Sequence, residues 1–227
     1  MHSSQIKKVL EHDPNVFVTI PLSLSREQCY YPSMTQPYEC EVRFKIENID
    51  AFEATLAKLG AKIALPYEFT DHYYKPAGTP WNPVEKSLRI REWVEPPRPT
   101  TIYFVKLEIM TMEGLRFKRS LYPEGKQALF SGPLDLCRRL LDDLGFESWF
   151  AIRKEKARLW EVPDHHFFTA VEYIEGIGWT AELEFEGQDP QVAARSIRQA
   201  LDLLQIPPHL VTHKPISTIY LDTSTKS

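Results

Sequence analysis

Charged and apolar residues alternate strictly along residues 39–45, which read Glu-Cys-Glu-Val-Arg-Phe-Lys. Successive side chains of an extended strand point to opposite faces, so Glu39, Glu41, Arg43 and Lys45 share one face. The three apolar residues between them share the other face. An ordinary half-buried strand with its charges in water has the same pattern.

Three later segments repeat this pattern, which changes its interpretation. Doubled charges occupy alternate positions in each: Arg89 and Arg91 in residues 87–91, Lys154, Lys156 and Arg158 in residues 152–158, and Glu182 and Glu184 in residues 181–185. Several strands with doubled charges favour one shared, charged interior over several unrelated wet faces.

Turn residues and periodicity divide the rest of the chain into further elements. Helices are predicted after Asp50, near Ser131 and after Asp189, and an additional edge strand over Ile216–Leu221. Eight strands are predicted in all, at residues 39–45, 63–74, 87–91, 102–110, 115–121, 149–160, 167–173 and 179–186.

Eight strands joined by short turns, with few helices, favour an α+β fold: an antiparallel, closed or nearly closed barrel with the helices packed outside. The strands are then charged on the inside and apolar on the outside. Ionised groups that face a narrow interior are costly unless they are paired, solvated or bound to a ligand. A wet tunnel that binds a highly charged ligand supplies the physical reason for this inversion.

Composition excludes several classes of protein. The 227-residue chain is 43% hydrophobic and carries a net charge of −4, which suits a globular protein and disfavours a binder of duplex nucleic acid. No apolar run approaches the roughly 20 residues that span a bilayer, and no secretory signal is visible. The three cysteines form no metal-type spacing and suit a reducing compartment. We expect a cytoplasmic protein without a membrane partner.

Proline-rich punctuation sets residues 1–35 apart from the rest of the chain. We predict an N-terminal extension over residues 1–35 and a tunnel domain over residues 36–222. The oligomeric state is left open, with a homodimer as one arrangement.

The charged positions indicate the class of ligand. Arginine forks and lysine point charges bind phosphate oxygens, and so many cations in one cavity would repel each other without a polyanion. Carboxylates beside phosphate binders suit Mg²⁺ or Mn²⁺, which prefer oxygen ligands. The cationic candidates are Arg43, Lys45, Arg89, Arg91, Lys106, Lys154, Lys156 and Arg158, with Lys118 or Arg119 as further candidates. The acidic candidates are Glu39, Glu41, Glu182 and Glu184, with Asp71 and Glu172 behind them.

An ordered set of motifs resembles the CYTH superfamily, the triphosphate tunnel metalloenzymes. Each motif alone is weak, but together they cover roughly residues 38–205 in the family's order. The set comprises Glu39-x-Glu41-x-Arg43, Asp71-His72-Tyr73-Tyr74, Leu88-Arg89-Ile90-Arg91, Lys106, Leu144-Gly145-Phe146 followed by Lys154 and Lys156, and Gly178 through Glu182-x-Glu184.

The resemblance implies an eight-stranded antiparallel tunnel, a triphosphate or nucleotide substrate and a divalent cation, Mg²⁺ or Mn²⁺. It implies that the glutamates Glu39, Glu41, Glu182 and Glu184 hold the metal. It assigns catalysis to Glu39, Glu41 and Lys106. Substrate binding falls to Arg43, Lys45, Arg89, Arg91, Lys106, Lys154, Lys156 and Arg158.

The fifth strand departs from the family pattern. Family members commonly carry Arg-x-Glu-x-Glu there, whereas this chain has Arg116-Phe117-Lys118-Arg119-Ser120, with no acid pair. Glu172 is the nearest match to an aspartate of the seventh strand, and we expect Glu172 and Glu108 to be paired structural charges. Asp71 is left open between a structural and a functional role.

Three functions remain as alternatives. The first is a metal-dependent hydrolase in which water attacks a terminal phosphorus of a triphosphate. The second is a class IV adenylyl cyclase, in which the ribose 3′-hydroxyl of ATP attacks the α-phosphorus and pyrophosphate leaves. The third, suggested by the missing acid pair, is a protein that binds polyphosphate or nucleotide without catalysis.

Overall fold

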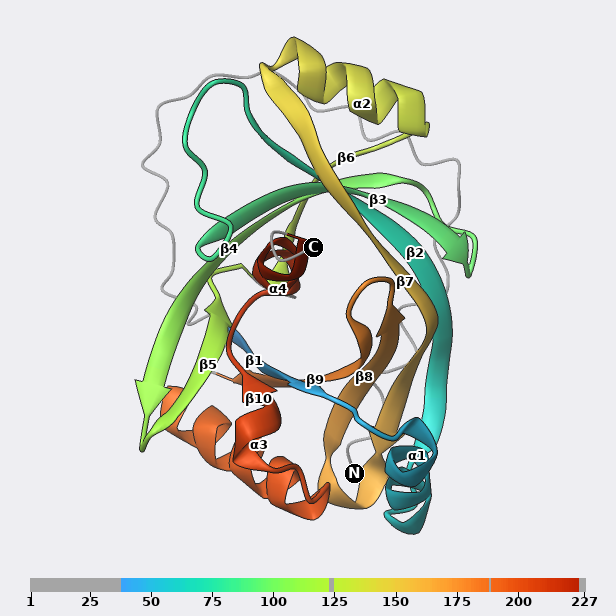
Figure 1. Ribbon diagram of the computed structural model, residues 1–227, viewed down its shortest axis with the longest axis vertical. Coiled ribbons are helices and arrows are strands. Elements are labelled where there is room, and N and C mark those ends of the chain that lie inside the picture. Colours follow the sequence, from blue (N-terminus) through green and yellow to red (C-terminus); the bar gives the residue numbers. More distant parts are fainter. Residues whose placement is uncertain (1–37, 123–124, 188, 225–227) are drawn as a thin grey trace, which may run out of the picture. The chain divides into compact units, whose positions relative to one another are not determined.

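Eight strands form a closed antiparallel barrel in the computed structural model, which describes residues 38–122, 125–187 and 189–224 (Figure 1). The predicted N-terminal extension, residues 1–35, lies outside the described residues. Around the barrel the order is β1-β5-β4-β3-β2-β7-β8-β9, and β9 pairs with β1 to close the ring. The predicted barrel is therefore confirmed. Its strands are β1 (Tyr38–Lys45), β2 (Lys62–Pro76), β3 (Lys86–Glu95), β4 (Thr101–Met112), β5 (Leu115–Ser120), β7 (Phe146–Val162), β8 (Phe167–Ile174) and β9 (Gly178–Gly187).

Two short strands outside the ring were not predicted. β6 (Gln127–Ser131) pairs with β4, and β10 (Val211–Thr212) pairs with β1. Neither interrupts the closed set, so the charged faces of the barrel strands still converge on one interior.

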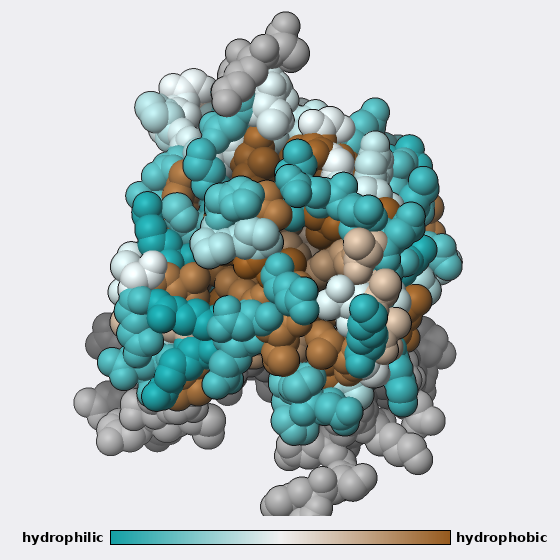
Figure 2. Space-filling view, turned by 60° about the horizontal axis from the view of Figure 1, so that its bottom comes forward, coloured by the Kyte–Doolittle hydropathy of each residue, from teal (hydrophilic) through white to brown (hydrophobic). Residues whose placement is uncertain are grey.

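Helices cover the apolar outer faces of the barrel. α3 (Pro190–Leu203) packs its stripe, which includes Ile197, against Val42 and Leu183 of β1 and β9. α2 (Leu134–Asp143) covers Ile90 and its neighbours on β3 and β4, and α1 (Ile49–Lys58) buries Phe52 and Leu56. Polar residues cover much of the outer surface, with apolar residues visible between them (Figure 2). The apolar alternate positions of the strands are thus used for packing outside the barrel.

The helix starts follow their capping residues. α3 begins as predicted, because the Asp189 side chain accepts a hydrogen bond from the backbone N–H of Gln191. α1 begins slightly earlier than the Asp50 prediction implies, because Asn48 is its cap and accepts from the N–H of Ala51.

The C-terminal segment is a helix, so the edge strand predicted over Ile216–Leu221 is wrong. α4 (Ile216–Ser224) follows Pro215, whose carbonyl accepts from the N–H groups of the first turn. Ile216 and Tyr220, four residues apart, pack on the same apolar cluster around Ile152. Figure 1 shows α4 within the outline of the barrel, viewed toward its opening. The apolar residues of this segment therefore form one face of a helix and not one face of a strand.

Truncation of Ile197 should test whether α3 stabilises the barrel. Ile197 is fully buried, so Ile197→Ala should lower the free energy of unfolding by about 3 kcal/mol through lost burial and a cavity. Val192→Ala on the same helix is the control, since Val192 is 49% exposed and its loss should cost less than about 0.5 kcal/mol. Urea denaturation of both variants measures the difference. Equal losses would mean that α3 contributes little through its packed face.

Candidate active site

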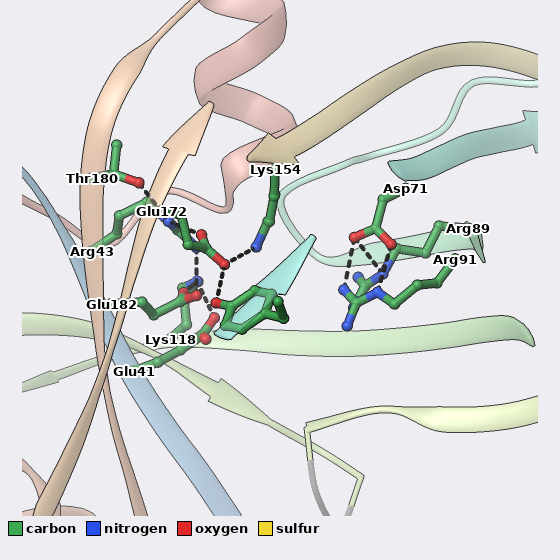
Figure 3. Close-up of polar contacts among 11 residues, drawn as sticks. Glu41, Arg43, Asp71, Arg89, Arg91, Lys118, Lys154, Glu172, Thr180 and Glu182 are labelled. Atoms are coloured by element: carbon green, nitrogen blue, oxygen red, sulfur yellow. Dashed lines mark hydrogen bonds and ion pairs between the residues drawn. The ribbon is translucent and has the colours of Figure 1, made fainter. Parts of the chain in front are cut away.

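The barrel encloses a charged cavity of about 260 Å³. Among the described residues, six cationic and six acidic side chains line it, so its charge is nearly balanced. The cationic residues are Arg43, Arg89, Arg91, Lys118, Lys126 and Lys154, and the acidic ones are Glu39, Glu41, Asp71, Glu172, Glu182 and Glu184. Figure 3 shows most of these side chains in two groups that face the same interior.

Arg43 is the centre of the first group. Its side chain is 2% exposed, and Nη1 donates to Glu172 Oε2 and to Thr180 Oγ1, both at 2.9 Å. Nη2 donates to Glu182 Oε2. The register explains this arrangement, because Arg43 of β1 lies directly opposite Glu182 of β9.

Glu172 joins this group to the opposite wall. Its Oε1 accepts from Tyr67 Oη on β2 and from Lys154 Nζ on β7, both at 2.7 Å. The expected pairing of Glu172 is therefore present, while its purely structural role stays a prediction. Burial opposes ionisation of Glu172, but Lys154 and Arg43 outweigh it and lower the pKa of the carboxyl.

Lys118 of β5 also joins the first group (Figure 3). Its Nζ contacts Glu182 Oε1 at 2.8 Å and forms a second ion pair with Glu41. Burial alone would lower the pKa of the Lys118 ammonium. The charges of Glu182 and Glu41 outweigh burial and raise this pKa. Lys118 therefore keeps its proton and its positive charge inside the barrel.

Asp71 organises the second group. Its two oxygens accept from Nε and Nη2 of Arg91, both at 2.8 Å, and its Oδ2 lies 3.2 Å from Nε of Arg89. The Arg91 guanidinium also lies 3.7 Å from the centre of the Phe69 ring. Asp71 thus holds two guanidiniums in place on the neighbouring strand, where they line the cavity.

Glu39 and Glu184 form a separate acidic pair. Burial, the nearby charges of Glu184 and Glu41, and a hydrogen bond with the Glu184 carboxyl raise the pKa of Glu39 to about 10. The backbone at Gly125 approaches this carboxyl so closely that a Cβ would lie 2.2 Å from both Glu39 oxygens. A side chain there would displace the Glu39 carboxyl, and the φ of +72° is one that glycine adopts most readily.

Lys126 is a cavity residue that the alternation pattern did not reveal. It follows Gly125 just before β6 and lines the cavity near Arg91, Arg89 and Glu39. Burial, Arg91 and Arg89 lower the pKa of Lys126. A lone lysine in a connection carries no periodic signal, so spacing alone could not single it out.

The structure does not bring Lys156 and Arg158 into the cavity. A bulge in β7 shifts its register with β8 between Glu155 and Arg158, and Lys156 has a φ of +50°. Lys154 faces inward before the bulge and Leu159 after it, so Lys156 is exposed and Arg158 pairs with Glu53 of α1. One extra residue reverses the facing of every side chain beyond it.

Lys106 and Lys45 also lie outside the cavity lining. Ile102 and Phe104 of β4 pack outward in the cluster beneath α2, which turns Val105 and Leu107 inward and Lys106 to solvent. Lys45 is exposed at the end of β1 and lines a separate surface pocket with residues of α4. The catalytic function assigned to Lys106 gains no support from this position.

The four predicted metal ligands differ in their fit to a divalent cation. Both oxygens of Glu182 already accept from Lys118 and Arg43, and Glu41 contacts Lys118. Burial and Glu184 raise the pKa of Glu39 to about 10, and burial and Glu182 raise the pKa of Glu41 to about 8, so both carboxyls would gain from a nearby divalent cation. No group of three or more His, Cys, Asp or Glu that could hold a metal was found in the part of the chain that the structure describes. Two carboxylates still suffice where substrate phosphates complete the shell, as is usual for Mg²⁺.

Asp71 supplies a prediction about stability and pH. Burial opposes its ionisation, but Arg91 and Arg89 outweigh burial and lower its pKa from 3.8 to about 2. The ionised form is thus favoured by folding, which contributes about 2 kcal/mol above about pH 4 and is lost as pH falls through about 2. Asp71→Asn should lower the free energy of unfolding by about 2 kcal/mol or more at pH 7, because it leaves two arginines unpaired.

Denaturation of wild type and Asp71→Asn across pH 2 to 7 measures this effect. The gap between them should shrink below about pH 4. Asp135→Asn on α2 is the control, since the Asp135 side chain is 90% exposed. A gap that stays constant down to pH 2 would show that the charge of Asp71 is not its source.

Comparison with solved structures shows that this barrel has known counterparts. A conserved hypothetical protein from Pyrococcus furiosus is 22% identical with a TM-score of 0.60, covering 82% of this chain and 99% of that one. A candidate adenylate cyclase from Vibrio parahaemolyticus is 17% identical with a TM-score of 0.61, covering 82% and 98%. A candidate adenylyl cyclase from Hippeastrum, with a dominant triphosphatase activity, is 13% identical with a TM-score of 0.51, covering 76% and 89%. At these identities the likeness concerns the fold alone.

Sequence comparisons complete the assignment. No curated protein matches the chain. Within the described residues, no helix is both long and apolar enough to cross a bilayer. The family model of the CYTH domain matches residues 37–212, which span the whole barrel from β1 to β10. The chain therefore belongs to the CYTH family.

Proposed function

We propose that the protein is a triphosphatase that hydrolyses a triphosphate bound in the barrel cavity, with a divalent cation as cofactor. The observation that carries the proposal is the convergence of six cationic side chains on one cavity of about 260 Å³. Arg43, Arg89 and Arg91 are held by carboxylates before any ligand binds. Donors fixed in this way lose little free energy to reorganisation when a phosphate arrives.

The charge balance of the cavity supports a need for a cation. The six acidic side chains offset most of the charge of the six cations even with the carboxyl of Glu39 protonated, so the lining keeps only a small positive excess against the several negative charges of a triphosphate. Glu39 and Glu184 would hold a divalent cation, Mg²⁺ or Mn²⁺, together with the substrate's phosphates. When bound, the cation would neutralise phosphate charge and polarise the phosphorus under attack.

The chain's own residues would then orient the reactants. The guanidiniums of Arg89 and Arg91 would bind phosphate oxygens as planar forks, and Lys154 and Lys126 would add point charges. Glu41, close to Glu39, is our candidate for orienting the attacking water, in agreement with its position in the family motif. Catalysis here is mainly a matter of positioning and charge stabilisation.

Hydrolysis is favoured over cyclisation by what lines the cavity. The cyclase must hold adenine as well as ribose, and amide side chains are the usual readers of adenine's hydrogen-bonding edge. The described residues of the lining include no Asn or Gln. The lining therefore supports recognition of phosphates better than recognition of one base.

Phosphorus NMR of the protein with ATP and with tripolyphosphate, each with Mg²⁺ or Mn²⁺, tests the proposal. Orthophosphate is expected from at least one substrate. Glu184→Gln should lower turnover by about a hundredfold, the usual cost of one charge-stabilising group. Pyrophosphate with a cyclic nucleotide would instead identify a cyclase. Thermal stabilisation by the same ligands without product would identify a binding protein.

One part of the cavity wall is apolar and suits an organic group attached to the triphosphate. Leu65 of β2 lies beside Leu159 of β7, and Trp93 of β3 lies beside Phe69 of β2, their rings 5.1 Å apart. All four residues line the cavity. An aromatic base could stack there, with a stabilisation of about 1–3 kcal/mol.

Trp93→Ala should therefore separate organic from inorganic substrates. The KM for ATP should rise about tenfold, which corresponds to about 1.4 kcal/mol, while the KM for tripolyphosphate stays within about twofold. Trp149→Ala is the control, because Trp149 does not line the cavity. An equal rise for both substrates would mean that Trp93 only supports the wall.

A further inference from the structure

β4 faces the cavity without a charge, although the family resemblance expects a lysine on this strand. The residues of β4 that line the cavity are Val105 and Leu107, both apolar. Lys106 lies between them in the sequence and is exposed, because successive side chains of a strand face opposite ways. The strand therefore supplies no ammonium to the described lining at the place where one is expected.

The chain that follows β5 returns to β4 at the same place. The backbone N–H of Leu121, just after β5, donates to the Lys106 carbonyl at 2.9 Å. Gln127, the first residue of β6, pairs with Phe104. β5 and β6 thus follow one another along one side of β4, and the connection between them starts beside Lys106 and ends beside Phe104.

Strand register shows where this connection brings its own lysine. β6 is antiparallel to β4, so the residue before Gln127 lies beside the residue after Phe104. Those two residues are Lys126 and Val105, and both line the cavity. Lys126 therefore reaches the cavity next to the inward-facing position of β4 that carries no charge.

Lys126 also lies close to the arginines of the second group. The centre of the Tyr103 ring is 5.8 Å from Nζ of Lys126 and 5.8 Å from the guanidinium carbon of Arg91. Arg91 donates to Asp71 through Nε and Nη2, and its Nη1 has no hydrogen-bond partner among the described residues. Glu39 offsets part of the charge of Lys126. The two neighbouring cations still repel each other, and a phosphate group can accept from both.

We propose that Lys126, a residue of the connection before β6, is the lysine that binds the substrate's phosphates beside β4, in place of Lys106. A loop residue would then make a contact that the family motif assigns to a barrel strand. The proposal rests on the proposed function, since it concerns the same cavity and the same substrate. Its test measures binding without turnover, so the two can fail separately.

Calorimetric titration of the full chain with tripolyphosphate in EDTA tests the proposal, because the proposed hydrolysis needs a divalent cation. Lys126→Met should weaken binding at least about tenfold, since it removes a hydrogen bond between charged groups. Lys126→Arg keeps the charge and should stay within about threefold of wild type. Lys106→Met is the matched control and should stay within about twofold, because Lys106 faces solvent.

Restoring the ammonium from β4 is the sharper test. Val105→Lys in the Lys126→Met background returns a cation to the neighbouring position of the cavity wall, so the affinity should recover to within about threefold of wild type. Val105→Met in the same background adds a side chain without charge and should restore nothing. Unfolding curves show which variants are folded, and the comparison of Lys126→Met with Lys126→Arg provides the test if the double variant is not.

Four results would overturn the proposal. They are no binding of tripolyphosphate by wild type at millimolar concentrations, a folded Lys126→Met that binds within about twofold of wild type, an equal loss from Lys106→Met, or a folded double variant with Val105→Lys that recovers no affinity. Binding that depends on Lys126 without phosphate release in Mg²⁺ or Mn²⁺ would overturn the proposed function and leave the role of Lys126 standing.

Discussion

The buried guanidinium of Arg43 is the interaction on which the charged interior depends. It contacts Glu172 of β8, Glu182 of β9 and Thr180 of β9 from its own strand, β1, and so spans the seam where the barrel closes. A buried charge is tolerated only where partners replace its lost hydration. Arg43 obtains those partners only in the closed ring, which ties barrel closure to the charge pattern.

The rest of the cavity extends the same rule outward from Arg43. Glu172, which pairs with Arg43, also accepts hydrogen bonds from Lys154 and Tyr67, and Glu182 also pairs with Lys118. Across the cavity, Asp71 holds Arg89 and Arg91 in the same manner. Each of these cations is oriented by an acid that faces it, so the cavity is organised in the free protein. A polyanion would meet fixed donors, but most of its negative charge would still need a further cation.

Alternation was sufficient for three strands over the positions that matter here. Residues 39–43 of β1, 87–91 of β3 and 182–184 of β9 alternate without a bulge, so the facing of Glu39, Arg89 and Glu182 could be predicted from position alone. It was insufficient where a local event changes the phase. The bulge in β7 turned Lys156 outward. The prediction missed this because one extra residue cannot be recognised in an alternating pattern.

Tertiary packing decided the other departures. The outward packing of Ile102 beneath α2 fixed the facing of Lys106, and neither facing of β4 could be chosen from its own residues. Lys126 lies in the loop before β6, where side chains do not alternate between two faces, so no pattern could predict that it lines the cavity. The prediction for α4 was wrong because a short apolar-rich segment fits both a strand and one face of a short helix. Long-range context supplied what the local pattern lacked.

The pairing of β1 with β9 has a consequence for how the protein folds. These strands are the first and last of the ring, and Arg43 and Glu182 are 139 residues apart in sequence. We expect this pairing to form late in folding, because closing a long loop lowers the conformational entropy of the chain before the new contacts stabilise it. During synthesis β1 leaves the ribosome long before its partner exists. The polar cavity is therefore a property of the finished ring, and no N-terminal fragment that lacks β9 could assemble it.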